Sequence, residues 1–347
     1  AAPNGFDVNP ITRANYDIEE QTLAAYGKLN FGTENVTGNL GLRVVQTDQN
    51  SQGVQVVGGT EFPASFDNDY TYALPSLNVK WDINDDLVGR FAAYRSLTRP
   101  RLTDISPGRS LENFDGGNGT AGNPDLDPFT ATNIDLGLEW YFAESAAATF
   151  AVFHKDLNGL IERTVEEVQV VDPGSGQTIT INLSRPTNAD GATVTGFEVG
   201  LQAPFSSGTG PLSNAGFQVN ASFADSDADF TNTDDIRSAS LEGLSEESYN
   251  AIVYYDVEAF NARLAYNWRS EFLQRVSGSG GNPISRDDYG QLDFSSTWNI
   301  NDDWSLTLDI LNLTDEELEV FTFQDPRFAA GTSQTGRRYL LSATWRM

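Results

Sequence analysis

Residues 133–142, NIDLGLEWYF, decide the fold of this chain of 347 residues. Every second position is apolar, and polar or small residues fill the positions between; the apolar members are Ile134, Leu136, Leu138, Trp140 and Phe142. A period of two is the pattern of a β-strand with one apolar and one polar face. The stretch is also as long as a tilted strand needs to cross a bilayer, about 9–11 residues.

The same alternation recurs in the segments 76–83, 217–223, 262–269 and 291–300. It predicts about thirteen strands along the chain. Their connections alternate between two kinds. The short ones lie at 32–38, 84–87, 143–146, 204–213, 256–260 and 301–304, and the long ones, rich in Gly, Asp, Asn and Pro, at 48–68, 100–128, 160–190, 226–246, 273–287 and 314–335.

Short turns at one rim and long loops at the other are typical of a bacterial outer-membrane β-barrel, whose short turns face the periplasm. The tryptophans support this fold class. Trp81, Trp140, Trp298 and Trp304 lie close to short turns, as in the aromatic girdle of a membrane protein, and only Trp268 lies towards a long loop. A soluble β-sandwich lectin is the weaker alternative, since its tryptophans would have no reason to gather at one rim.

Composition excludes several classes of function. The 49 acidic and 21 basic residues give a net charge of -28, which repels DNA and RNA, so no nucleic acid is expected as a partner. With no cysteine and one histidine, His154, the chain has no set of residues for thiolate catalysis or a His/Cys metal site. We place His154 on a strand, at a boundary with the lumen or a loop, and expect no catalytic residue.

One acidic segment imitates the start of a calcium-binding loop. Asp225, Asp227 and Asp229 have EF-hand spacing, but Phe230 stands where the loop needs Gly and Ile236 where it needs Glu. We therefore expect an acidic loop, no metal site, no cofactor and no enzyme activity.

An odd strand number has a consequence for completeness. If Met347 ends in the periplasm, residues 1–15 begin on the extracellular side, whereas a bacterial single-chain barrel has an even number of strands. An open sheet would leave unpaired edges in lipid. The sequence thus predicts that residues 1–347 are the incomplete C-terminal part of a barrel, with further strands before Ala1.

Several segments, in order along nearly the whole chain, resemble the barrels of TonB-dependent outer-membrane receptors, particularly a proteobacterial branch often linked to carbohydrate uptake. Among them are YDIEEQTLAAYGKLNF (16–31), SLTRPRLTDISPG (96–108), GNPDLDPFTATNIDLGLEWYF (122–142) and GRRYLLSATWRM (336–347). The resemblance implies an all-β transmembrane barrel of about 22 strands, of which this chain supplies about the last thirteen, without the plug domain. It implies coupling to the TonB–ExbB–ExbD complex through that plug, and contact with outer-membrane lipid and lipopolysaccharide.

The resemblance further implies active uptake of a scarce solute, with binding residues in the extracellular loops and lumen. Our candidates are Arg99, Arg101, Asn113, Phe114, Asp115, Arg269, Phe272 and Phe323. The aromatic members offer stacking surfaces for a ring. An oligosaccharide is the preferred solute and a ferric siderophore or other metal chelate the alternative. A passive porin or a structural barrel is the competing class.

Overall fold

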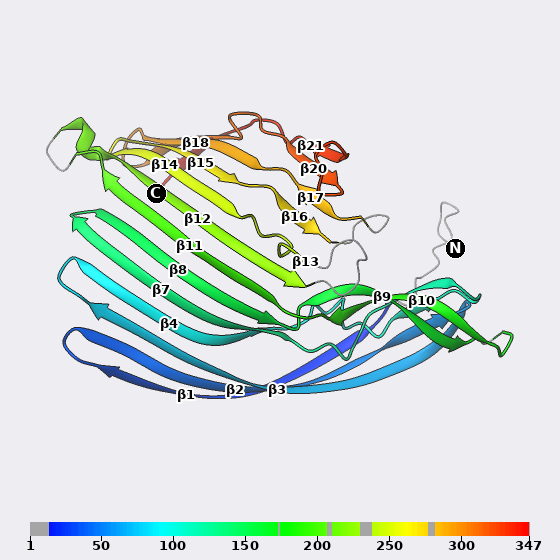
Figure 1. Cartoon of the computed structure of the whole chain (residues 1–347). Coiled ribbons are helices and arrows are strands. Elements are labelled where there is room, and N and C mark those ends of the chain that lie inside the picture. Colours follow the sequence, from blue (N-terminus) through cyan, green and yellow to red (C-terminus); the bar gives the residue numbers. More distant parts are fainter. Residues whose placement is uncertain (1–13, 173, 207–209, 230–237, 277–281, 347) are drawn as a thin grey trace.

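The computed structural model describes residues 14–172, 174–206, 210–229, 238–276 and 282–346. Its main element is a sheet curved into a trough (Figure 1). Within the described residues, thirteen long strands form the wall of this trough, each antiparallel to the next in the chain. They are β1 (Asp17–Gly32), β2 (Val36–Val57), β3 (Thr60–Asp82), β4 (Leu87–Thr98), β7 (Phe129–Ala143), β8 (Ala146–Asn158), β11 (Ala192–Pro204), β12 (Ala215–Asp229), β14 (Glu247–Val257), β15 (Phe260–Arg269), β18 (Tyr289–Asn299), β19 (Trp304–Leu311) and β22 (Arg338–Trp345).

All six predicted short connections are found at one end of the wall (Figure 1). One of them includes the 3-10 turn η2 (Pro211–Asn214). No helix in the described part of the chain is long and apolar enough to span a membrane.

The connection expected at 48–68 is different from the prediction. These residues extend β2 and β3 to 22 and 23 residues, and the hairpin turns at Gly58 and Gly59, whose φ angles of 54° and 80° favour glycine. Because a tilted strand needs only about 9–11 residues to cross a bilayer, the outer part of this hairpin projects well beyond it.

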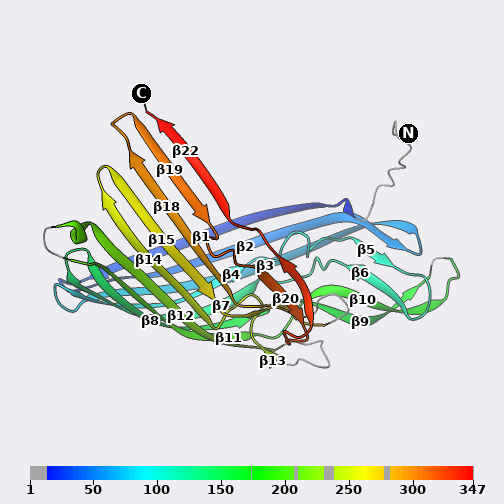
Figure 2. The ribbon, with the colours of Figure 1, turned by 90° about the horizontal axis from the view of Figure 1, so that it is seen from above.

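The wall is open. Among the described residues β1 pairs only with β2, and β22 only with β19, so neither edge strand closes the sheet. Figure 2 shows β22 and β1 as separate edges. The 22-strand total and the missing plug stay predictions. The predicted extracellular start concerns residues 1–15, of which residues 1–13 lie outside the described part.

The two faces of the wall have opposite chemistry. On β7, Leu136 and Trp140 are 51% and 52% exposed, while Asn133 on the other face is 3% exposed. Side chains crowd on the concave face and spread on the convex one, so the apolar face is the convex face. An apolar surface this extensive is not stable in water, where soluble monomers rarely expose apolar patches above a few hundred Å². It fits hydrocarbon on the outside and a polar lumen within.

Aromatic rings mark both limits of the apolar band. Near the short turns, Trp304 lies 6.1 Å from Trp345 and Phe260 lies 5.7 Å from Trp298, measured between ring centroids. Near the loops, a continuous row crosses four strands, with centroid distances of 4.7, 5.7 and 5.1 Å along Phe197, Phe223, Tyr249 and Trp268. Trp268 belongs to this second girdle, which the sequence analysis did not predict.

Shorter strands in the long connections build two groups at the other end of the wall. The first, which we call the β9–β10 group, contains β5 (Arg109–Leu111), β6 (Gly117–Ala121), β9 (Ile161–Val171) and β10 (Thr178–Asn188), and it continues the main sheet through β2. The second is a separate four-stranded sheet of β16 (Phe272–Arg275), β17 (Ile284–Arg286), β20 (Leu318–Thr322) and β21 (Ala329–Ser333). A two-residue strand, β13 (Ser238–Ala239), pairs with β12.

Candidate functional site

The loop end of the concave face is the candidate site, because the predicted binding residues gather there on several elements. The β9–β10 group is held together by a buried apolar cluster of Val57, Leu111, Ile179, Ile181 and Leu183. In the four-stranded sheet, Leu273 and Phe321 are buried. Both groups are therefore packed structures. We call the loop end of the concave face, with the side chains that these groups position there, the mouth.

Arg99 follows β4 directly and reaches across the concave face. Its guanidinium donates to Thr22 Oγ1 at 3.0 Å and to Thr47 Oγ1 at 3.2 Å, and Thr47 is completely buried. Both partners are uncharged, and none of the ion pairs recorded among the described residues includes Arg99. An arginine has five donors, so part of its hydrogen-bonding capacity and its whole charge are left for a ligand.

Arg101 begins the turn that follows. Its carbonyl oxygen accepts from the amides of Asp104 and Ile105 at 2.8 and 3.3 Å, and its side chain is exposed. The rest of this 100–128 connection is pinned to the β2–β3 hairpin, where Gln49 donates to the Pro124 carbonyl at 3.1 Å. The hydrogen bond thus anchors this connection to the wall at the mouth.

Asn113, Phe114 and Asp115 share the tight turn between β5 and β6. Asp115 Oδ1 accepts from the amide of Thr180 at 2.8 Å and so ties the turn to β10, which gives Asp115 a structural role. Phe114 is 55% exposed. Phe114 therefore offers an exposed ring to a ligand at this turn.

Arg269 and Phe272 come into direct contact. The guanidinium carbon of Arg269 lies 3.8 Å from the centroid of the Phe272 ring. The same guanidinium donates to Ser245 Oγ and to the carbonyl of Gly243, both at 2.8 Å. These contacts fix the orientation of a cation on the lumen side of β15 without neutralising it.

A second cation stands beside it in the four-stranded sheet. Arg286 is near enough to Arg269 for their charges to repel, and its Nε donates to Gln274 Oε1 at 3.1 Å. Neither arginine is in a recorded ion pair within the described residues. Like charges held together without a counter-charge attract anions.

Phe323 lies on another element, in the β20–β21 turn. Its ring is 5.3 Å from that of Phe328, and both are about half exposed. The turn is strained, since Phe323 and Gln324 have φ angles of 59° and 52°. The guanidinium of Arg327 donates to the carboxylate of Asp325, with Nε 2.9 Å from Oδ1, and holds the pKa of that carboxyl below its usual value.

The predicted candidates therefore do not form one pocket. Arg269 and Phe272 touch, Asn113 to Asp115 share a turn, and Arg99 and Phe323 lie on separate elements. The residues that contact these candidates were not predicted from the sequence; they are chiefly Thr22, Thr47, Ser245, Arg286 and Phe328. Only Phe328 had a local signal, as the second aromatic in the turn FQDPRF.

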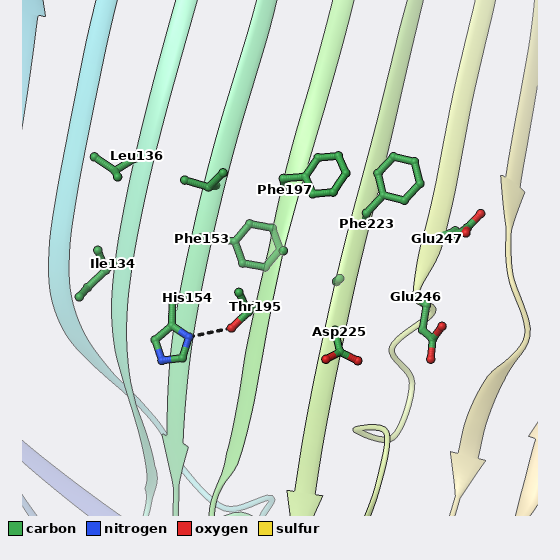
Figure 3. Close-up of a pocket in the computed structure, with 13 residues that line it drawn as sticks. Ile134, Leu136, Phe153, His154, Thr195, Phe197, Phe223, Asp225, Glu246 and Glu247 are labelled. Atoms are coloured by element: carbon green, nitrogen blue, oxygen red, sulfur yellow. Dashed lines mark hydrogen bonds between the residues drawn. The ribbon is translucent and has the colours of Figure 1, made fainter.

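His154 lies on a strand, as predicted, but it does not border the lumen. It lies on β8 in register with Ile134, on the convex face, and its Nδ1 is 2.8 Å from Thr195 Oγ1 (Figure 3). It faces away from the lumen because its position on the strand has the parity of the apolar residues.

Comparisons with known proteins agree with this architecture. The family profile described as "TonB dependent receptor-like, beta-barrel" matches residues 1–313. An iron-regulated outer membrane virulence protein of Vibrio cholerae is 23% identical over 276 residues, which cover 78% of this chain and 38% of the relative. The chain thus spans about four tenths of the length of the curated relatives it matches.

Solved structures share the fold. The ferric-catecholate import receptor Fiu of E. coli K12 superposes with a TM-score of 0.69 at 14% identity, over 95% of this chain and 45% of Fiu. The ferric yersiniabactin uptake receptor FyuA of Yersinia pestis gives 0.65 at 17% identity, over 95% and 46%. The ferric enterobactin receptor PfeA of Pseudomonas aeruginosa gives 0.64 at 17% identity, over 94% and 54%.

Proposed function

The chain belongs to the TonB-dependent receptor family, and on that premise we propose that the full protein takes up an anionic ferric chelate of the siderophore class. The family places the chain in the bacterial outer membrane, as part of the β-barrel of a receptor and transporter.

The observation that carries this proposal is the charge at the mouth. The chain has a net charge of -28, yet Arg99, Arg269 and Arg286 present guanidinium groups whose recorded partners are uncharged. An arginine without a counter-ion is a site for oxyanions, because its fork of donors suits carboxylate and phenolate oxygens. Ferric complexes of catecholate ligands are anions, since their phenolate oxygens outweigh the charge of iron.

The named relatives support the same solute class. The Vibrio cholerae relative is iron-regulated, and Fiu, FyuA and PfeA are receptors for ferric complexes. From the sequence, an oligosaccharide was the preferred solute and a ferric chelate the alternative. These relatives favour the alternative, and the unneutralised arginines add a physical reason, because they attract an anion by its net charge and a neutral sugar has none.

An oligosaccharide stays the second candidate on one observation. Phe114 and Phe323 are more than half exposed at the loop end, and aromatic faces stack on sugar rings as well as on catechols. Two ligand classes therefore compete for the same mouth, and they differ in charge.

A ligand panel separates them. The full-length receptor, purified in detergent, is titrated calorimetrically with a ferric catecholate, the same catecholate without iron, a maltodextrin and a chitooligosaccharide. We expect binding of the ferric complex that weakens as salt rises, because screening acts on charged ligands. Binding of a sugar alone would overturn the proposal in favour of the second candidate.

Energy coupling is proposed from family membership. Uptake should depend on TonB with ExbB and ExbD, acting through a plug domain of the whole protein. The test is accumulation of the radiolabelled ferric chelate in cells with and without a functional tonB gene. Equal accumulation in both would support the passive porin instead.

A further inference from the structure

One arginine of the β9–β10 group has no role in the proposed uptake and no partner in the fold. Arg109 begins β5, and its Nε is buried without a hydrogen-bond partner. No ion pair recorded among the described residues includes Arg109. Burial, with no contribution from a charged neighbour, lowers the pKa of its guanidinium. A cation in this position is unfavourable unless an anion binds to it.

The strand order places a second arginine near it. In the β9–β10 group the strands follow one another as β2, β5, β6, β10 and β9 (Figure 2). Arg109 pairs with Ala121 on β6, and Arg185 follows Ser184, which pairs with Thr120 on the same strand. Arg185 therefore stands beside Ala121 on the next strand. The two arginines are two strand spacings apart, about 10 Å, and the side chain between them is a single methyl group.

Both arginine side chains leave the sheet on the same face. Arg109 is two residues from Leu111 on β5, and Arg185 is two residues from Leu183 on β10, so each pair shares a face. Both leucines belong to the buried apolar cluster of this group. The partner of Arg109 on β2 is Gln55, which lies on the concave face by its parity along that strand. The two cations are therefore on the mouth side of the sheet, next to the apolar cluster.

The carboxylates of this group are engaged with other partners. Glu112 Oε2 accepts from a backbone amide of β6 at 2.7 Å, and Asp115 Oδ1 accepts from a backbone amide of β10 at 2.8 Å. Glu166 lies 2.6 Å from Nε of Arg185. This ion pair leaves the two terminal nitrogens of Arg185 with their donors. The space over Ala121 therefore has two guanidinium groups beside it and one paired carboxylate, in a protein with a net charge of -28.

We propose that this space is an oxyanion site, in which the carboxylate or phosphate group of a small solute binds between Arg109 and Arg185. The planar fork of a guanidinium donates two parallel hydrogen bonds to such a group. The bound anion gives Arg109 the acceptor and the counter-charge that the fold does not supply. Ala121 leaves room for it, because a longer side chain would lie between the two cations. The site is independent of the proposed cargo, since it needs no iron and uses other arginines.

The test is calorimetric titration of the full-length receptor in detergent with malonate and with inorganic phosphate, at an ionic strength held constant with chloride. Because the other arginines of the mouth attract anions too, the background is the triple variant Arg99→Gln, Arg269→Gln and Arg286→Gln. In it we expect at least one of the two anions to bind saturably. Arg109→Gln should then lower the affinity by about tenfold or more, the effect of losing charge-assisted hydrogen bonds. Arg109→Lys, which keeps the charge and loses the fork, should keep part of the affinity.

Arg163→Gln is the matched control. Arg163 lies in the same group, but its guanidinium donates to the backbone carbonyls of Ala121 and Ser184, at 3.5 and 3.3 Å. Its position on β9 has the opposite parity to that of Glu166, so it lies on the other face. Its replacement should leave the affinity unchanged. Equal losses in Arg163→Gln and Arg109→Gln would overturn the proposal, and so would the absence of binding of both anions in the triple variant.

Hydrogen exchange separates a solute site from an ion pair within the full-length protein. Without added anion, Arg109→Gln should leave exchange in β5, β6 and β10 unchanged or slower, because it removes a charge that has no partner. With the anion that binds, exchange in these strands should slow in the parent protein and not in the variant. Faster exchange in Arg109→Gln without anion would mean that a carboxylate of the protein already holds Arg109, and the proposal would be wrong.

Discussion

The guanidinium carbon of Arg269 lies 3.8 Å from the centroid of the Phe272 ring, while Ser245 Oγ and the Gly243 carbonyl accept hydrogen bonds from the same guanidinium. A long side chain on a strand end would otherwise sample many rotamers, and ordering it on binding would weaken affinity by about 0.5–1.5 kcal/mol. The contact with Phe272 restricts the rotamers of Arg269 before a ligand binds. It also fixes the direction in which the guanidinium points at the mouth.

Substitutions of Arg269 and Phe272 test whether the oriented guanidinium contributes to ligand binding. Arg269→Gln should weaken the affinity for a ferric catecholate by about tenfold to a hundredfold, since a hydrogen bond to a charged group contributes about 1.5–3 kcal/mol. Phe272→Leu should weaken the affinity by only a few-fold, because the charge of Arg269 stays and only its contact with the ring is lost. Calorimetric titration of the full-length receptor measures both. Arg346→Gln, at the short-turn rim, is the charge-matched control, and a loss of affinity there equal to that of Arg269→Gln would contradict the assignment.

The apolar convex face should tolerate no charge when the barrel is folded in lipid. Leu138 stands in the apolar band of β7 and is 41% exposed to what surrounds the wall. Leu138→Arg should therefore destabilise the folded barrel in lipid vesicles by about 2–4 kcal/mol, the cost of an arginine near the bilayer midplane. The measurement is the urea midpoint of unfolding in vesicles. Ala92→Arg introduces the same side chain on the concave face beside Asp135 and should be tolerated; equal destabilisation would mean that the faces are assigned the wrong way round.

The wall could be predicted from the sequence because its signal is local. Alternation over about ten residues identifies each membrane strand, and a hairpin of such strands leaves little choice of partner. The 48–68 segment escaped prediction for a related reason. Its Asp, Asn and Gly residues are typical of loops, but Asn50 donates to Asp67 across the same hairpin at 2.7 Å, and the backbone pairing continues to Val57 and Thr60, so the two strands extend into solvent.

The mouth could be predicted only as a list of residues. Arg269 and Phe272 are close in sequence, and their contact follows from that closeness. Arg99 meets Thr22 and Thr47 across sequence separations of 77 and 52 residues, which no local pattern encodes. Similarly, the loop-side girdle was missed because three of its four rings are Phe and Tyr, residues that also occur in any strand, and only their register across strands reveals a row.

One ion pair joins two neighbouring strands on the lumen side of the wall, and its coupling energy can be measured directly. Arg90 on β4 donates to Glu139 on β7 through Nε at 2.7 Å and a terminal nitrogen at 3.1 Å. Because Arg90 is half exposed, water screens the pair, and its coupling energy should be about 0.2–1 kcal/mol. A double-mutant cycle with Arg90→Gln and Glu139→Gln, read from urea unfolding of the full-length barrel, measures it. A coupling above about 2 kcal/mol would mean that the pair is shielded from water in the whole protein, as covering by a plug domain would produce.

The turn that presents Phe323 and Phe328 should respond to acid. Hydrogen bonds from the Arg327 side chain and then from its backbone amide lower the pKa of Asp325, so the carboxylate form is the one the turn stabilises. A carboxyl with a lowered pKa in the folded state contributes to stability. This contribution is complete above the pKa of the unfolded state, about 3.9, and is lost as the pH falls through the lower pKa of the folded state. The turn should therefore keep its geometry at neutral pH and loosen only in strong acid, whereas Asp325→Asn should loosen it at every pH. Carboxyl-carbon NMR of the full-length receptor, labelled at aspartate, follows the titration. In Arg327→Gln the pKa of Asp325 should move up towards the ordinary value; an Asp325 pKa that does not move would mean that the ion pair does not order the turn.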